Sequence, residues 1–233
     1  MQSDWEMGLL WYGVFVFSTV LHEAAHAWTA LKLGDDTAAR GGQVSLNPLP
    51  HIRREPFGMV VVPILSWMAG GWLIGWASAP FNPEWARRHP RHAAVMALAG
   101  PAANLFLVVS AAWLIRIGGE WGWFAAPHSI NSSRLAVAIQ SGWPEFAATA
   151  LSVVLSLNLL LFVFNLIPLP PLDGSNAPLL LLPPAAAARY AEFLRTPWLG
   201  LVGVLVASRV LGPFFPTVLR FVANLIYPHS HFY

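Results

Sequence analysis

The chain has 233 residues, of which 56% are hydrophobic and 10% are charged, and its formal net charge is only +2. Soluble domains carry about 25% charged residues, so this composition excludes an ordinary water-soluble domain and indicates an integral membrane protein. The small net charge argues against nucleic acid as a partner, and the lack of cysteine excludes disulfide bonds and thiolate metal ligands.

The first long apolar segment covers about residues 8–32 and is long enough to span a bilayer as a helix. It contains the motif His22-Glu23-Ala-Ala-His26, in which the two histidines are four residues apart. This spacing places both imidazoles on one helix face, where they can bind one zinc ion, with Glu23 beside them to accept a proton. The segment therefore predicts part of a zinc site at membrane depth.

The following loop, residues 33–56, contains an alternation of polar and apolar side chains that predicts a short strand in a β-hairpin near the active site: Gln43-Val44-Ser45-Leu46. The exposed edge of such a strand could bind an unwound transmembrane substrate by strand addition. The alternative is a hairpin that pairs only with itself. His51 is a candidate for lining the catalytic cavity, with ordinary hydrogen bonding in a loop as the alternative.

Residues 57–79 form a second apolar segment, which contains one proline and several glycines. Such residues suit a kinked helix or a re-entrant segment packed inside the protein, so both a span and a re-entrant segment stay open.

The third apolar segment, residues 92–117, contains Asn104. An amide inside an apolar helix needs a hydrogen-bonding partner. Asn104 is therefore a candidate for supporting the zinc ligands, and helix packing through Gly100 and Asn104 is the alternative.

The fourth segment, residues 145–167, leads into Asn165-Leu-Ile-Pro168-Leu-Pro170-Pro171-Leu-Asp173-Gly174. Its prolines must interrupt a regular helix, and broken backbone at membrane depth has to line a cavity or pack on protein. Asp173 is therefore predicted to be the third zinc ligand. The alternative is a proline-rich turn that leaves Asp173 at the surface.

Two more apolar segments cover about residues 196–212 and 213–228. The sequence thus predicts an all-α polytopic membrane protein with about five to six transmembrane helices. We expect a single domain over residues 1–233, with a catalytic core at about 8–175 and C-terminal helices at about 176–228.

These motifs, in this order, resemble those of the site-2 protease family of intramembrane zinc metalloproteases, in its short branch without PDZ or CBS domains. The matching elements are His22 to His26, Gly34-Asp35, Asn47-Pro48-Leu49-Pro50-His51, Ala99-Gly100-Pro101-Ala-Ala-Asn104, and Asn165 to Gly174. They extend over about residues 8–175. Ala25 stands where many family members have glycine.

The resemblance implies one zinc ion per chain, bound by His22, His26 and Asp173, with Glu23 as the general base and Asn165 as a stabiliser of the oxyanion. It further implies a multi-pass protein of a prokaryotic plasma membrane, which meets its substrate in the lipid bilayer. The substrate would be a membrane protein or a signal-peptide remnant.

Two other functions stay open on the sequence. One is a catalytically silent membrane scaffold on the same fold, against which the intact Glu23 argues. The other is a metal transporter, which predicts several polar residues along a path, whereas the sequence shows one compact cluster. Membrane orientation and oligomeric state are undetermined.

Overall fold

The structure is a computed structural model that describes residues 4–71, 73–230 and 232. Within these residues the regular secondary structure is helical apart from one two-stranded sheet. The elements in chain order are α1 (Asp4–Lys32), α2 (Thr37–Arg40), α3 (Pro48–Arg54), the π-helical turn η1 (Phe57–Val61), α4 (Val62–Gly70), α5 (Pro83–Arg88), α6 (Pro90–Glu120), β1 (Phe124–Ala125), β2 (Val137–Ala138), α7 (Trp143–Asn165), the 3₁₀ helix η2 (Asp173–Leu180), α8 (Pro184–Phe193) and α9 (Pro197–Ile226).

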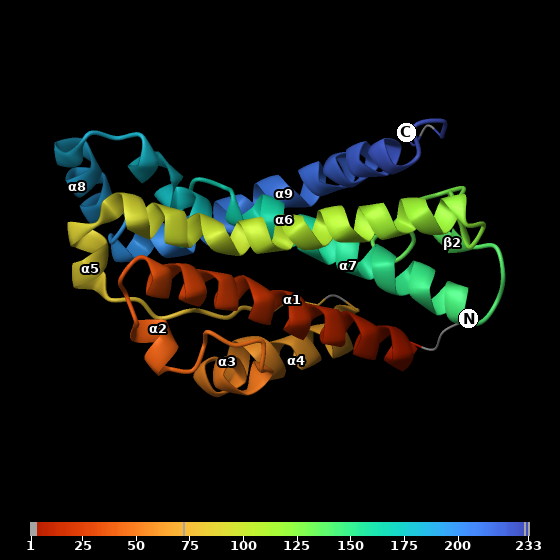
Figure 1. Cartoon of the computed structure of the whole chain (residues 1–233), viewed down its shortest axis with the longest axis horizontal. Helices are drawn as coiled ribbons and strands as arrows, with labels where there is room; N and C mark the ends of the chain where they lie inside the picture. The colour runs from red at the N-terminus through yellow and green to blue at the C-terminus, as the bar shows by residue number, and fades with distance from the viewer. Residues whose placement is uncertain (1–3, 72, 231, 233) are drawn as a thin grey trace.

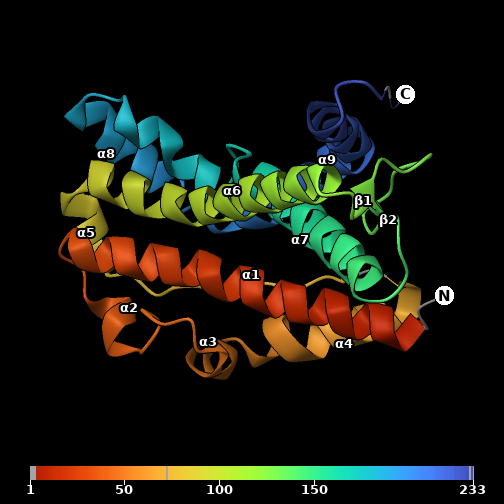
Figure 2. The same cartoon turned by 45° about the vertical axis from the view of Figure 1, so that its right-hand side comes forward.

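Four helices of the described chain are long and apolar enough to cross a membrane: Trp5–Lys32, Pro90–Glu120, Trp143–Asn165 and Trp198–Ile226. They run roughly along the long axis of the molecule, and α6 packs against both α1 and α7 (Figures 1 and 2). The fold is that of an all-α polytopic membrane protein, and the described residues contain four candidate spans where the sequence predicts about five to six transmembrane helices.

The segment 57–79 accounts for part of this difference. Its helical part ends at Gly70, because Gly71 adopts a left-handed conformation with φ +68°. Helix Phe57–Gly70 is too short to span a bilayer, and residues 73–82 continue as an extended segment beside α1. The re-entrant alternative thus describes this segment better than the spanning one.

The two segments at 196–212 and 213–228 form one helix, α9, with Pro213 and Pro216 inside it. A proline removes the donor of only one helical hydrogen bond, and a long apolar helix tolerates that loss. The prolines therefore do not divide the helix, and the two predicted C-terminal segments count as one candidate span.

The predicted strand at Gln43-Val44-Ser45-Leu46 is wrong, because residues 44–46 form bends. The side-chain amide of Gln43 donates to the Ser78 carbonyl at 3.0 Å, and the Ser45 hydroxyl accepts from the Asn47 N–H at 3.0 Å. Such side-chain bonds compete with strand pairing. The hairpin lies instead between α6 and α7, where Phe124 pairs with Ala138, so the strand edge expected to bind substrate is absent at 43–46.

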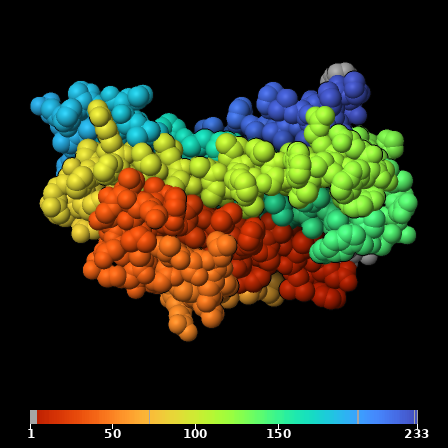
Figure 3. Space-filling model, in the orientation of Figure 1, coloured from red at the N-terminus to blue at the C-terminus, as the bar shows by residue number. Residues whose placement is uncertain are grey.

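The main apolar core is formed by α6, α7, α9 and the hairpin, with Ile115, Leu135 and Leu155 completely buried. In contrast, many large apolar side chains of the long helices are exposed, among them Phe106, Trp113 and Leu201. Figure 3 shows α1 and α6 side by side on one face of the molecule. Exposed apolar side chains on long helices are expected where lipid is the solvent.

Asp35, just after α1, accepts a hydrogen bond from the backbone at the start of α5. It is buried, although the sequence places it in a loop. Its Oδ1 accepts from the backbone N–H of Thr37 at 3.0 Å and from the Thr37 hydroxyl at 2.5 Å. Its Oδ2 accepts from the Asn82 N–H at 2.7 Å. Burial alone would raise the pKa of Asp35, but these hydrogen bonds and the charge of Arg40 outweigh it, so the pKa lies below its ordinary value of 3.8.

We expect Asp35→Ala to lower the stability of the fold by about 1–3 kcal/mol, because two backbone N–H groups and a hydroxyl lose a charged acceptor. A lowered folded-state pKa means that the ionised carboxylate stabilises the protein at pH values above the unfolded-state pKa. That contribution disappears as the pH falls through the folded-state pKa. The check is thermal unfolding in detergent at pH 3 to 7: the two proteins should differ at neutral pH and converge in acid. Equal unfolding temperatures at neutral pH would contradict this role for Asp35.

Candidate metal centre

Two histidines of α1 bring ring nitrogens together at one buried point. His22 and His26 are four residues apart on the same face of the helix, and both side chains are buried. Their Nε2 atoms lie 2.9 Å apart, and the rings meet edge to face.

The protonation of both rings follows from their other nitrogens. The Nδ1 of His26 lies 2.8 Å from the Met96 carbonyl oxygen, which can only accept, so this Nδ1 carries the proton. The Nδ1 of His22 lies 2.6 Å from Oδ1 of Asn104 and donates to it in the same way. In the neutral form of each ring the lone pair is therefore on Nε2, which is the form in which histidine binds metal, and the two Nε2 atoms face one another.

Asp173 completes this group from a distant part of the chain. Its Oδ2 lies 3.2 Å from Nε2 of His22 and 3.4 Å from Nε2 of His26. This oxygen is buried and has no hydrogen-bond donor among the described residues. The proline-rich turn after α7 carries Asp173 back against that helix, since Gly174 packs directly on the backbone of Leu166. The surface alternative for Asp173 is therefore wrong.

The separations of His22 Nε2, His26 Nε2 and Asp173 Oδ2 suit three ligands of one small cation. With both rings neutral, two imidazole lone pairs and a carboxylate oxygen would repel at 2.9–3.4 Å, and either a proton or a metal cation among them removes that repulsion. Ligands of a tetrahedral zinc ion, bound at about 2.0–2.2 Å, lie about 3.3 Å from one another. The observed separations match that value.

Gly100 of α6 leaves room for such an ion. A methyl group at residue 100 would lie 2.5 Å from Nε2 of His22, and closer still to Nε2 of His26. Only glycine keeps open the space in front of the two lone pairs. We therefore find that the residues present fit a metal ion with two nitrogen ligands, one oxygen ligand and an open position.

Glu23 follows His22 directly and is also buried. A carboxylate oxygen of Glu23 and a ring nitrogen of each histidine all lie within 4.8 Å of one another. This places a second carboxylate beside the metal position without making it part of the His22, His26 and Asp173 triangle. Glu23 is therefore available for proton transfer.

The cluster lies between helices that are candidate membrane spans. His22 is ten residues before Lys32, and Gly100 is ten residues after Pro90. At a rise of 1.5 Å per residue, both lie about 15 Å from the helix ends that meet beside α5. The cluster is therefore well inside both helices, each of which is long and apolar enough to cross a membrane.

Within the described residues, the other predicted site residues make no hydrogen bond or ion pair with the histidine cluster, Asn104 excepted. Asn165 is the last residue of α7, next to the Leu166–Gly174 contact, and its side chain makes no hydrogen bond within the described part of the chain. His51 is completely buried in α3, where its Nε2 donates to the Ser45 carbonyl at 3.1 Å. No contact brings His51 or Gln43 to the described histidine cluster.

Three residues around the cluster were missed from the sequence. Gly100 was considered only for helix packing, and Ser18 carried no signal. Asn158 lies inside the apolar helix α7 and is completely buried. It therefore had the same signal as Asn104, an amide at membrane depth that needs a partner.

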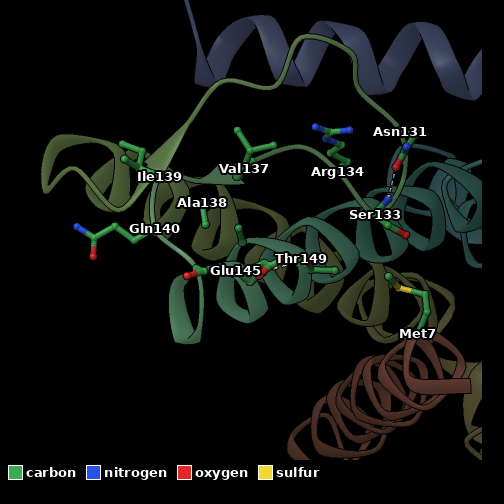
Figure 4. Close-up of a pocket in the computed structure, with 13 residues that line it drawn as sticks. Met7, Asn131, Ser133, Arg134, Val137, Ala138, Ile139, Gln140, Glu145 and Thr149 are labelled. Atoms are coloured by element: carbon green, nitrogen blue, oxygen red, sulfur yellow. Dashed lines mark hydrogen bonds between the residues drawn. The ribbon is translucent and has the colours of Figure 1, made fainter. Parts of the chain in front are cut away.

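A cavity of about 560 Å³ lies elsewhere, between the 131–141 loop and the start of α7 (Figure 4). Met7 of α1 also lines it, and none of the predicted site residues does. Met7 precedes His22 by fifteen residues, which is about 22 Å along the helix. This cavity is separate from the metal centre.

Comparison with known proteins agrees with this chemistry. The chain is 35% identical over 179 residues to "Putative zinc metalloprotease YwhC" of Bacillus subtilis, covering 76% of the chain and 71% of that relative. It is 30% identical over 176 residues to "Putative zinc metalloprotease Rip2" of Mycolicibacterium smegmatis, covering 72% of the chain and 58% of that relative. No protein-family model matches the chain, and no solved structure matches it significantly.

Proposed function

The chain belongs to the site-2 protease family of zinc metalloproteases, and on that basis we propose that it is an intramembrane zinc endopeptidase. It hydrolyses peptide bonds in or near the transmembrane segments of membrane proteins. The observation that carries this proposal is the meeting of three potential ligand atoms, from His22, His26 and Asp173, beside the buried Glu23 and inside candidate membrane-spanning helices.

One zinc ion per chain would be held by His22, His26 and Asp173. A zinc ion in this position supplies Lewis acidity, which activates water and polarises the carbonyl oxygen of a peptide. The position left open by Gly100 is where water and substrate approach.

Glu23 transfers the protons of the reaction. Its carboxylate accepts a proton from the attacking water and then delivers it to the nitrogen of the leaving amine. Burial suits this role, because few other proton acceptors are near and the carboxylate stays oriented. We assign Asn165 as the donor that stabilises the oxyanion, since it lies next to the turn that returns Asp173 to α7.

The proposed substrates are membrane proteins or signal-peptide remnants, and the proposed location is the plasma membrane of a prokaryote. A transmembrane helix hides its peptide bonds in hydrogen bonds between residues i and i−4. Hydrolysis therefore requires local unwinding, and helix-breaking residues in the substrate should favour cleavage.

The test is cleavage of a panel of transmembrane peptides by the purified full chain in detergent, with zinc measured in the same preparation. We expect about one zinc ion per chain, together with cleavage that a chelator stops and added zinc restores. Zinc without cleavage of any peptide would support the silent scaffold. Zinc flux into liposomes, again without cleavage, would support the transporter.

A further inference from the structure

We propose that a relay of buried amides, Asn158 to Asn104, fixes the His22 ring in its metal-binding form. In this relay Asn104 and Asn158 are positioning residues, and Ser18 anchors the far end. The inference rests on the proposed zinc site and adds the device that orients one of its ligands.

The relay joins three helices in an unbroken chain of hydrogen bonds. Asn104 of α6 accepts from Nδ1 of His22 through Oδ1 at 2.6 Å, and its Nδ2 donates to Oδ1 of Asn158 at 2.8 Å. Nδ2 of Asn158, on α7, donates to the Ser18 hydroxyl of α1 at 2.9 Å and to the Val154 carbonyl at 2.8 Å. The side chains of Ser18, Asn104 and Asn158 are completely buried.

The orientation of each amide follows from the one before it. The Val154 carbonyl can only accept, so Asn158 must turn its Nδ2 toward it and its Oδ1 toward Asn104. That oxygen needs a donor, so Asn104 must present its Nδ2 to Asn158 and its Oδ1 to His22. His22 can then meet Asn104 only with a protonated Nδ1, so the neutral ring has its lone pair on Nε2, the nitrogen that faces Asp173.

The two histidines are therefore oriented by different means. His26 donates to the Met96 backbone carbonyl, which cannot turn over. His22 donates to a side-chain amide, which could present its NH₂ end instead. Because Asn158 blocks that alternative, His22 depends on a side chain that does not touch it.

Membrane depth strengthens this dependence. Little water reaches the middle of a bilayer, so each polar group there has to find its partner inside the protein. Reversing one amide would leave at least two buried groups unpaired. The relay therefore has a single satisfied arrangement, and that arrangement exposes the ligating lone pair of His22.

The test measures the zinc dissociation constant by chelator competition on the full chain in detergent, without substrate. Asn104→Leu removes the acceptor for His22 and should weaken zinc binding about 10–100-fold. Asn158→Leu frees the Asn104 amide to turn over, so it should weaken zinc binding by a smaller, several-fold factor. Ser152→Ala is the matched control, because Ser152 is a buried polar residue of α7 that bonds to Leu135 and lies outside the relay.

A rescue separates orientation from packing. In its ionised form an aspartate at residue 104 accepts with either oxygen and has no donor to present to His22. Adding Asn104→Asp to Asn158→Leu should therefore restore zinc binding toward that of the wild type. If Asn158 acts only through packing, the second substitution will not restore it. This comparison decides the question even if Asn104→Leu does not fold.

The outcomes are distinct. Wild-type protein that is folded but binds no zinc would overturn the proposed metal site, and the relay with it. If the wild type binds zinc, two results would overturn the relay alone. One is zinc binding by folded Asn104→Leu that is as tight as in the wild type. The other is a failure of Asn104→Asp to restore zinc binding to Asn158→Leu. Several-fold weakening by Asn158→Leu that Asn104→Asp reverses is the expected result.

Discussion

Replacing Glu23 with glutamine is expected to lower kcat for peptide hydrolysis about 10²–10⁴-fold, the range measured for the loss of a general acid or base. Glutamine fills the same volume but cannot take up the proton of the attacking water. Zinc content should stay at the wild-type level, because the three converging atoms belong to His22, His26 and Asp173. The measurement is cleavage of a transmembrane peptide beside zinc analysis of the same sample.

Two further variants sharpen this prediction. Glu23→Asp keeps a carboxylate on a shorter side chain and should retain more activity than Glu23→Gln. Glu145→Gln removes an exposed acid near the start of α7 and should cleave like the wild type. Cleavage by Glu23→Gln at the wild-type rate would show that another group moves the proton.

Replacing Gly100 with alanine is expected to abolish zinc binding and cleavage together. The added methyl group would occupy the space in front of His22 Nε2 and His26 Nε2, where an ion would have to lie. Helix propensity alone favours alanine over glycine by about 1 kcal/mol. Helix propensity would therefore not explain a loss of zinc, whereas the clash of the methyl group with the two histidine rings would.

The matched control is Gly13→Ala in α1, where no atom lies within 4 Å of the added methyl group. That variant should bind zinc and cleave like the wild type, with equal or slightly higher thermal stability. Zinc content and thermal unfolding of both variants provide the check. If Gly100→Ala kept a full complement of zinc, the metal could not lie between the two histidines.

Gly100→Ala and Glu23→Gln separate two parts of the site that lie within a few ångströms of each other. The first should remove the ion, and the second should leave it in place without its proton acceptor. A variant series with both results would assign binding to the triangle of His22, His26 and Asp173, and proton transfer to Glu23.

The sequence by itself determined the local half of the site. The period of an α-helix places His22 and His26 on one face whatever surrounds them, and the structure confirms this with their Nε2 atoms 2.9 Å apart. The prolines before Asp173 likewise predict a broken backbone, and the turn returns Asp173 to the two histidines. The helix face and the broken backbone depend on covalent geometry and on residues near one another in the chain, whereas the meeting of Asp173 with the two histidines depends on tertiary packing.

The sequence was less reliable where an element depends on its surroundings. Segment 57–79 is apolar enough to span a bilayer, but a left-handed glycine at residue 71 ends its helix early. Residues 43–46 alternate like a strand, but side-chain hydrogen bonds to Ser78 and Asn47 replace the strand ladder. Hydropathy and the alternation of polar and apolar residues predict neither where a helix ends nor which side-chain hydrogen bonds replace strand pairing.

Only the tertiary structure decided which helices meet at the metal centre. Gly100 and Asn158 are separated from His22 by many residues of chain, and they reach it because α6 packs against α1 and α7. Periodicity fixes the direction of a side chain around its own helix axis, but not the neighbour that it faces. That neighbour is set by the packing of whole helices. The apolar setting of Asn158 signalled that its amide needs a partner, but the chain alone could not show that this partner is Asn104 or that Gly100 faces the two histidines.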